Sequence, residues 1–279
     1  MQTLLDEIVA QVSQVRGVRA AALGGSRARG THSATSDIDL GIYYDDPQAF
    51  DLEALGALAT RLDDERRVNL ITPIGGWGPW INGGGWLKVR SLAVDFLYRD
   101  LRQVQRVMND CCAGRVDVFY QPGHPLGFVS AMYMSETAVC RVLWEDAERP
   151  LTHLKARTVP YPAALKQALI ERFAWEIGFS LGIAHKGAGR SDTSYVAGCC
   201  FRAAMCMLQV LFALNEVYWL NEKGTAAIAD GFRLRPANLN ARLDEAFAGL
   251  SAEPAALERA IAALAGLEEE VQALTAQAG

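Results

Sequence analysis

Residues 24–44 read GGSRARGTHSATSDIDLGIYY, and this stretch decides the fold. A glycine pair, a serine and two arginines stand ahead of two aspartates, Asp37 and Asp39, which flank a single isoleucine. The segment SDID also fits the capping box that begins many helices. The residues after it, LGIYY, contain a glycine, a β-branched residue and two aromatics, which suit a strand better than a first helical turn. We therefore predict a strand over residues 38–44 with two carboxylates at its start.

The two aspartates indicate a metal site. Side chains alternate along a strand, so Asp37 and Asp39 are expected to project from the same face. Two carboxylates this close repel each other unless a cation lies between them. A hard divalent ion such as Mg²⁺ prefers oxygen ligands. We therefore expect Asp37 and Asp39 to bind magnesium.

The glycine-rich segment before the aspartates predicts a phosphate site. Its glycine spacing resembles a P-loop, but Thr31-His32 stands where that motif needs Lys followed by Ser or Thr, and a turn-rich segment follows where a helix should begin. We expect instead a turn whose amide, hydroxyl and guanidinium groups face phosphate oxygens. The residues that supply them are Gly25, Ser26, Arg27 and Arg29. Phosphate donors beside a metal site indicate a nucleoside triphosphate with its magnesium ion.

Together these motifs resemble the polymerase-β-like nucleotidyltransferase superfamily. The match is to its pattern G-S-x-x-x-G followed by S-D-x-D and an apolar residue, at Gly25-Ser26 and Ser36–Leu40. The spelling GSRARG is similar to the minimal and the aminoglycoside nucleotidyltransferases. The resemblance covers the first third of the chain. It implies a transferase that uses an NTP, ATP in our prediction, with two Mg²⁺ ions and a third carboxylate on a neighbouring strand.

Asp95 is the candidate for that third carboxylate, because LAVDFLY at residues 92–98 places one acid among apolar strand formers. The alternative is an edge-strand aspartate that faces water. Asp117 has similar neighbours but follows a helix rather than a hairpin, so it ranks second. Asp100 is expected to cap a helix that starts at Leu101. The predicted catalytic and metal-binding set is thus Asp37, Asp39 and Asp95.

The composition is that of a folded globular protein. The chain has 279 residues, of which 51% are hydrophobic and 21% charged, and this length suits one large or two modest domains. A net charge of -5 argues against a long nucleic-acid partner, because such proteins usually carry a basic face. The N-terminus lacks the basic start and apolar stretch of a signal peptide. The longest apolar run, residues 203–214, is shorter than the ~20 residues of a membrane span, so we expect no membrane segment.

The six cysteines and four histidines show no spacing typical of a zinc site. Two adjacent-cysteine pairs in a chain of this size indicate reduced, mostly buried thiols. We therefore expect a cytoplasmic protein.

The first part of the chain has the pattern of a mixed α/β domain. Helices are expected over residues 4–15 and 52–62, and strands over 18–23, 38–44, 68–72, 86–89 and 92–98, the last two joined by a turn at Arg90-Ser91. The segment GGWGPWINGGGW, residues 75–86, is either a lid or substrate wall, or a cover for the sheet edge.

Beyond about Pro150 the pattern is almost wholly helical. Helices are expected over residues 163–185, 194–220, 239–250 and 254–277. The last has an apolar seam with spacings of four and three, which favours packing inside its own bundle and leaves pairing with a second copy open. We expect an α+β fold: a small mixed-sheet nucleotidyltransferase domain at residues 1–125 and an all-helical, acceptor-binding domain at 126–279.

The second half also resembles uncharacterised bacterial nucleotidyltransferase-domain proteins with a helical C-terminal half, through YQPGHPLGF, SDTSYV and LNEKG. Lys186 and Asp192 lie near a helix start that is a candidate to close over the triphosphate, and Tyr195 is a candidate to stack on the base. Solvated charges at helix ends are the simpler interpretation. Glu136 lies where aminoglycoside-type enzymes place a second-domain base, although an ordinary helical glutamate fits equally well.

We therefore predict a Mg²⁺-dependent nucleotidyltransferase that is a monomer or a homodimer. Asp95 or Glu136 would take the proton of the acceptor hydroxyl. The acceptor would be a small hydroxylated molecule, such as an aminoglycoside-like compound. The alternatives are AMPylation of a protein, nucleotide addition to tRNA, and nucleotide binding without turnover.

Overall fold

The computed structural model describes residues 2–33 and 35–278. The chain divides into two compact units. The first consists of Met1–Asp110, Phe119–Gln121 and Phe128–Pro160, and the second of Cys111–Val118, Pro122–Gly127 and Tyr161–Gly279.

A five-stranded mixed sheet forms the centre of the first unit, in the order β3-β4-β2-β1-β7. Only β2 and β4 are parallel, and the other neighbours are antiparallel. A two-stranded sheet pairs β5 with β6. The strands are β1 (Val18–Leu23), β2 (Ile38–Tyr44), β3 (Gly84–Val89), β4 (Leu92–Asp100), β5 (Val118–Phe119), β6 (Phe128–Val129) and β7 (Arg141–Glu145). The helices are α1 (Gln2–Val12), α2 (Gly25–Arg29), α3 (Leu52–Leu62), α4 (Leu101–Cys112), α5 (Met132–Val139) and α6 (Pro150–Ala156).

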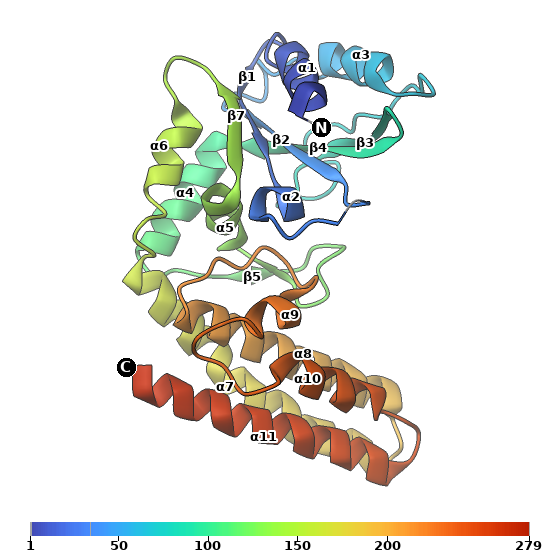
Figure 1. Cartoon of the computed structure of the whole chain (residues 1–279), viewed down its shortest axis with the longest axis vertical. Coiled ribbons are helices and arrows are strands. Elements are labelled where there is room, and N and C mark those ends of the chain that lie inside the picture. Colours follow the sequence, from blue (N-terminus) through green and yellow to red (C-terminus); the bar gives the residue numbers. More distant parts are fainter. Residues whose placement is uncertain (1, 34, 279) are drawn as a thin grey trace. The chain divides into compact units, whose positions relative to one another are not determined.

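The alternation of apolar and polar residues gives the sheet one fully buried face. Along β2, the side chains of Ile38, Leu40 and Ile42 are buried and pack in one cluster with the apolar faces of α1 and α3. Figure 1 shows α1 and α3 on one side of the sheet and α2 and α5 on the other. The side chains between the buried ones, Asp39 among them, therefore face the side of α2 and α5.

The strand expected at residues 68–72 does not form. Only Ile71 makes a bridge, to Gly85, because Arg66 and Asn69 have left-handed backbones (φ 56° and 58°) that interrupt an extended run. The edge of the sheet beside β1 is instead occupied by β7, which the sequence did not predict.

The pairing of β7 also changes where the chain divides into its two units. Because β7 pairs with β1, the segment from Phe128 to Pro160 belongs to the first unit. The expected boundary between residues 125 and 126 therefore differs from the division in the structure.

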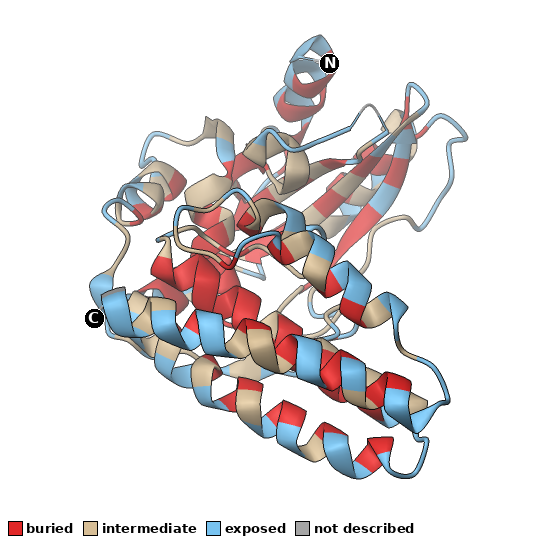
Figure 2. Cartoon of the chain, turned by 60° about the horizontal axis from the view of Figure 1, so that its bottom comes forward, coloured by how far each residue is buried: buried red, intermediate tan, exposed pale blue. Residues whose placement is uncertain are grey.

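The second unit is a helical bundle. Its helices are α7 (Ala163–Ala188), α8 (Thr193–Leu214), α9 (Thr225–Ala229), α10 (Leu239–Ala248) and α11 (Pro254–Ala278). In α11, buried residues recur at regular intervals (Figure 2), and Leu257, Ile261 and Leu264 are almost wholly inaccessible. The apolar seam thus packs inside its own unit, and the predicted fold class, a mixed-sheet domain followed by a helical bundle, is confirmed.

Helix α8 is the apolar centre of this bundle. It ends at Leu214 rather than Leu220, because the side chain of Asn215 bonds the carbonyl oxygen and the amide of Leu234, at 2.8 and 2.9 Å, and Glu216 is left-handed (φ 57°). By length and composition alone α8 could cross a membrane, but 72% of its most apolar window is buried inside the protein. This is the burial of a core helix.

Candidate active site

Two of the three predicted carboxylates lie beside each other on one face of the sheet. Asp39 on β2 and Asp95 on β4 are register partners in the parallel pair, and such partners project to the same face. Both residues are partly exposed. Their neighbours in β4, Val94 and Phe96, are fully buried on the opposite face. The predicted position of Asp95 is confirmed, while its role stays a prediction.

The third carboxylate, Asp37, lies just outside the sheet. β2 starts at Ile38, so Asp37 belongs to the exposed segment that leads into the strand. Over the described residues, 2–33 and 35–278, no three or more His, Cys, Asp or Glu side chains are grouped so that they could hold a metal ion. The aspartates therefore do not form a finished metal cluster. Their chemistry fits a hard divalent ion, because all three are carboxylates and two of them share a face.

Gly25 makes room for the carboxylate of Asp39. The amide of Gly24 donates to the carbonyl oxygen of Asp39 (2.8 Å), which ties the end of β1 to β2. A Cβ on Gly25 would lie 1.8 Å from Oδ2 of Asp39, and the backbone of Gly25 is left-handed (φ 59°). Glycine meets both conditions at no steric cost. The carboxylate of Asp39 thus lies directly against the backbone of the GSRAR segment.

The GSRAR segment forms the short helix α2, where the sequence predicted a turn. The amide of Ala28 donates to the carbonyl oxygen of Gly24 (3.1 Å), and the helix ends at Gly30, whose backbone is left-handed (φ 81°). Five residues are too few for an apolar period to appear in the sequence. The predicted phosphate ligands Ser26, Arg27 and Arg29 are all partly buried on this helix.

The two arginines of α2 have different environments. Nε of Arg27 donates to the carbonyl oxygens of Ser36 and Asp37, at 3.0 and 2.9 Å. Arg27 thus fastens α2 to the segment that carries Asp37, and its expected contact with phosphate oxygens stays a prediction. Burial lowers the pKa of the Arg29 guanidinium from its ordinary value.

Glu136 forms an ion pair with a buried arginine, Arg99. Nε and Nη2 of Arg99 donate to its two carboxylate oxygens, at 2.7 and 2.8 Å. The side chain of Arg99 is only 4% exposed. Burial opposes the charge of Arg99, but Glu136 outweighs this and raises the pKa of the guanidinium. Both oxygens of Glu136 are therefore engaged in holding α5 against β4, a structural role that the sequence did not reveal.

The remaining candidates for the nucleotide site lie in the helical unit. Asp192 is the N-cap of α8 and accepts a hydrogen bond from the amide of Tyr195 (3.2 Å). Lys186 lies exposed in the last turn of α7, and Tyr195 is 47% exposed. Asp192 therefore has a local structural role, whereas Lys186 and Tyr195 are accessible side chains.

The other two aspartates considered from the sequence have distinct settings. Asp100 caps α4 as predicted, because its carboxylate accepts from the amide of Arg102 (2.8 Å). Asp117 is exposed and belongs to the second unit. It is not part of the face that carries Asp39 and Asp95.

The tryptophan-rich segment is fixed on two sides. Trp80 packs in an aromatic cluster with Phe119, Phe128 and Tyr133. Trp77 stacks on Trp86, with ring centroids 4.5 Å apart and an interplanar angle of 22°. Trp86 on β3 is the register partner of Asp95. The sequence did not connect this tryptophan with the carboxylates, although the predicted two-residue turn at 90–91 already fixed the register of the hairpin.

The family comparison concerns the first unit. Residues 5–77 match the family model described as the nucleotidyltransferase domain. The match includes the GSRAR segment, Asp37 and Asp39, and ends before Asp95. No curated protein matches the chain. Among solved structures, a nucleotidyltransferase-like protein from Exiguobacterium sibiricum aligns over 98% of this chain and 73% of its own, with 13% identity and a TM-score of 0.43.

The matched residues carry the glycine-serine segment and the first two carboxylates, and the family that they match is described as a nucleotidyltransferase domain. The N-terminal part of this chain is therefore similar to a polymerase-β-like nucleotidyltransferase domain over residues 5–77.

Proposed function

We propose that this protein transfers a nucleoside monophosphate from an NTP, ATP in the first instance, to a hydroxyl group of a small molecule and releases pyrophosphate. The observation that carries the proposal is the register partnership of Asp39 and Asp95, with the carboxylate of Asp39 against Gly25. This arrangement puts acidic groups for the reacting phosphate next to the segment that would hold the rest of the triphosphate.

In the proposed step the oxygen of the acceptor hydroxyl attacks the α-phosphorus. The bond from this phosphorus to the bridging oxygen of the β-phosphate breaks, and pyrophosphate leaves with the electron pair. Asp95 takes the proton of the hydroxyl. We assign this role to Asp95 alone, because both oxygens of Glu136 are bound to Arg99.

Nucleotidyltransferases of this family typically use a divalent metal. We propose that Asp39 and Asp95, together with Asp37, hold Mg²⁺, with two ions as the family resemblance implies. When bound, the metal would lower the pKa of the attacking hydroxyl and stabilise charge on the α-phosphate and on the leaving pyrophosphate.

The triphosphate would contact Gly25, Ser26 and Arg29. Arg29 supplies a charge-assisted, forked donor suited to phosphate oxygens. Arg27 would act indirectly, because its guanidinium holds the carbonyl oxygens next to Asp37. We propose a cytoplasmic location, because the cysteine pattern of the sequence indicates reduced thiols.

Incubation of the protein with ATP labelled at the α-phosphate tests the proposal. With Mg²⁺ and a set of small hydroxyl compounds, label should appear in a small product, and the Asp39→Asn variant should form none. The same incubation with cell lysate separates the alternatives. Label found only in protein would indicate AMPylation, and label found only in tRNA would indicate nucleotide addition. No transfer from any mixture would leave a nucleotide-binding protein without turnover.

A further inference from the structure

An exposed tryptophan stands next to the carboxylate pair. Trp86 and Asp95 are register partners of the antiparallel hairpin, and Asp95 and Asp39 are register partners of the parallel pair. The three side chains therefore form a row on one face of the sheet, across β3, β4 and β2. Trp86 is 61% exposed, whereas its neighbour Leu87 is buried on the opposite face. The row therefore consists of an exposed indole followed by two carboxylates.

A second tryptophan supports the first one. A Cβ on Gly84 would lie 2.8 Å from the ring of Trp77, and Gly84 projects to the same face as Trp86 because the two are two residues apart in β3. Trp77 stacks on Trp86, and its carbonyl oxygen accepts a hydrogen bond from Nε2 of the buried Gln121 (2.7 Å). The indole of Trp86 is thus held in position by a partner that is itself anchored.

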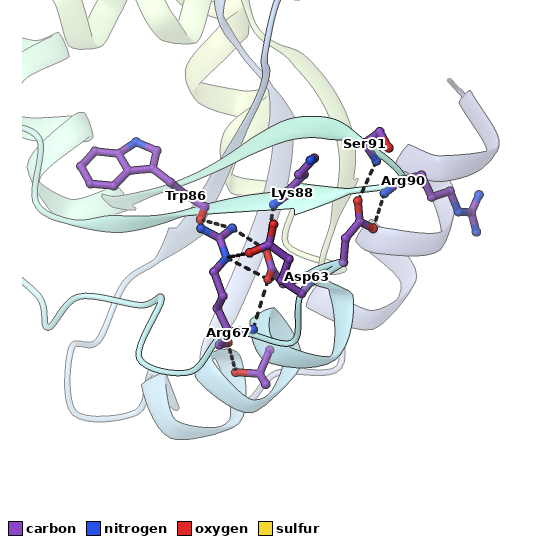
Figure 3. Close-up of polar contacts among 9 residues, drawn as sticks. Asp63, Arg67, Trp86, Lys88, Arg90 and Ser91 are labelled. Carbon is purple, nitrogen blue, oxygen red and sulfur yellow. Dashed lines mark hydrogen bonds and ion pairs between the residues drawn. The ribbon is translucent and has the colours of Figure 1, made fainter.

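The backbone of β3 is also held firmly. The buried carboxylate of Asp63 accepts from the amide of Lys88 (2.9 Å) and from the guanidinium of Arg67 (2.6 Å), which also reaches the carbonyl oxygen of Trp86 (3.5 Å). Asp64 accepts from the amides of both turn residues, 90 and 91, at 2.7 Å each. Figure 3 shows Trp86 and Lys88 pointing away from Asp63. These hydrogen bonds therefore hold the backbone of β3 at the residues whose side chains, Trp86 and Lys88, are exposed.

The direction of the reaction indicates what this surface meets. In an in-line displacement the attacking and leaving oxygens lie on opposite sides of the phosphorus. The GSRAR segment, which would hold the leaving pyrophosphate, contacts Asp39 at one end of the row. The acceptor then approaches from the other end, where Trp86 follows Asp95.

We propose that Trp86, supported by Trp77, is the acceptor platform of this enzyme and binds a sugar-like or aminocyclitol ring through its C–H face. The inference rests on the proposed nucleotidyl transfer and adds the place and the chemical class of the acceptor. An indole offers a flat apolar surface with a negative face, which suits C–H groups and amino-substituted rings.

A nucleic-acid acceptor is a poorer fit to this surface. Proteins that bind single strands use several aromatic side chains in succession along a basic groove. Trp77 covers part of the Trp86 indole by stacking on it, and Lys88 is the only cation among the six residues of β3. A single stacked indole with one neighbouring lysine is therefore a smaller surface than a nucleic-acid groove requires.

The test measures two affinities of the 279-residue chain, one for Mg²⁺ with a non-hydrolysable ATP analogue and one for ring probes. The ring probes are kanamycin A, maltose and adenosine. Their binding is measured by saturation-transfer NMR, and their reaction by transfer of label from ATP. Trp86→Ala should weaken binding of the sugar or aminocyclitol probe by roughly tenfold, the value of a good aromatic contact. It should leave the affinity for the ATP analogue unchanged, and Trp86→Phe should restore part of the loss.

Trp175→Ala is the matched control, because Trp175 lies on α7 and is similarly exposed (57%). It should alter neither affinity. The inference is overturned if neither kanamycin A nor maltose binds the wild-type protein, or if Trp86→Ala weakens the ATP analogue or adenosine instead, which would make Trp86 a nucleobase contact. Two other results would contradict the proposed function itself, on which the inference rests. They are a wild-type protein that binds no nucleotide, and an Asp39→Asn variant that binds nucleotide with unchanged affinity.

Discussion

The carboxylate of Asp39 lies so close to Gly25 that a Cβ at residue 25 would stand 1.8 Å from Oδ2 of the aspartate. The glycine of the glycine-serine segment therefore has a steric task as well as a conformational one. It lets the carboxylate of Asp39 on β2 lie directly against the backbone of the GSRAR segment, the proposed triphosphate site. The same contact makes the position of Asp39 sensitive to a single methyl group.

Gly25→Ala should abolish nucleotidyl transfer. The new Cβ must displace the carboxylate of Asp39, and the left-handed backbone (φ 59°) adds roughly 1–2 kcal/mol of strain. Gly30→Ala is the matched control, because Gly30 is also left-handed (φ 81°) but has nothing within 4 Å of an added Cβ. Thermal denaturation should show similar losses of stability for both variants, while label transfer is lost only in Gly25→Ala. Equal activity of the two variants would contradict the steric role of Gly25.

Asp95→Asn should reduce the transfer rate by at least roughly 10²–10⁴-fold, the usual contribution of a general base. The substitution keeps the size of the side chain, so the melting temperature should change little. The check is single-turnover transfer of label from ATP at saturating Mg²⁺. The control is Asp117→Asn, which changes an exposed aspartate of the second unit and should leave the rate within a factor of two or so.

The Glu136→Gln variant tests whether Glu136 is a catalytic base or only a structural carboxylate. It leaves the buried guanidinium of Arg99 without its counter-charge, so the protein should lose roughly 1–3 kcal/mol of stability. If the ion pair is the whole role of Glu136, the pH profile of kcat in the surviving folded protein stays that of the wild type. A kcat that no longer falls at low pH, with stability unchanged, would show that Glu136 is the base.

Substitution of the two arginines of α2 should change different kinetic constants. Arg29→Ala should raise the KM for the NTP by about one to two decades, because a charge-assisted contact to phosphate contributes roughly 1.5–3 kcal/mol of binding. Arg27→Ala should mainly lower kcat, because Arg27 holds the backbone beside Asp37. Initial rates over a range of ATP concentrations give both constants. An unchanged KM for Arg29→Ala would place this side chain outside the nucleotide site.

Local patterns predicted the elements of the sheet that carry the carboxylates, because apolar alternation and turn residues are read from neighbouring positions. Strands β1 and β2 begin and end where the sequence predicts. Pairings between distant segments were not visible in this way: β7 joins β1 from more than a hundred residues away, and Glu136 pairs with Arg99. The short helix α2 was missed because five residues carry no period.

The position of Trp86 opposite Asp95 lies between a local pattern, which the sequence shows, and a pairing of distant segments, which it does not. The two-residue turn at Arg90-Ser91 was predicted, and a turn of that length makes residues whose numbers sum to 181 face each other across the hairpin, as 89 and 92 do. Trp86 and Asp95 obey the same sum. The information was thus present in the sequence, but it required the turn type to be correct. Both turn residues adopt positive φ angles, 52° and 66°, which such hairpin turns require.

Asp63→Asn should destabilise the protein at neutral pH in a way that disappears in acid. Hydrogen bonds from Arg67, with further ones from the amides of Lys88 and Arg67, hold the pKa of the Asp63 carboxyl well below its usual range, although burial opposes this. A carboxyl whose pKa is lower in the folded state stabilises the fold above its unfolded pKa of about 3.9, and this contribution is lost as the pH falls from there towards the folded pKa. Removing the charge at pH 7 should therefore cost roughly 1–3 kcal/mol.

Urea denaturation of the wild type and of Asp63→Asn between pH 7 and pH 3 is the measurement. The difference in unfolding free energy should be constant from pH 7 to about 5 and should shrink below about 4. Asp63 holds the strand that carries Trp86. At neutral pH the variant should therefore lose more affinity for the acceptor probe than for the ATP analogue, each compared with the wild type. A difference in stability that does not change with pH would mean that the ionised carboxylate is not what fastens β3.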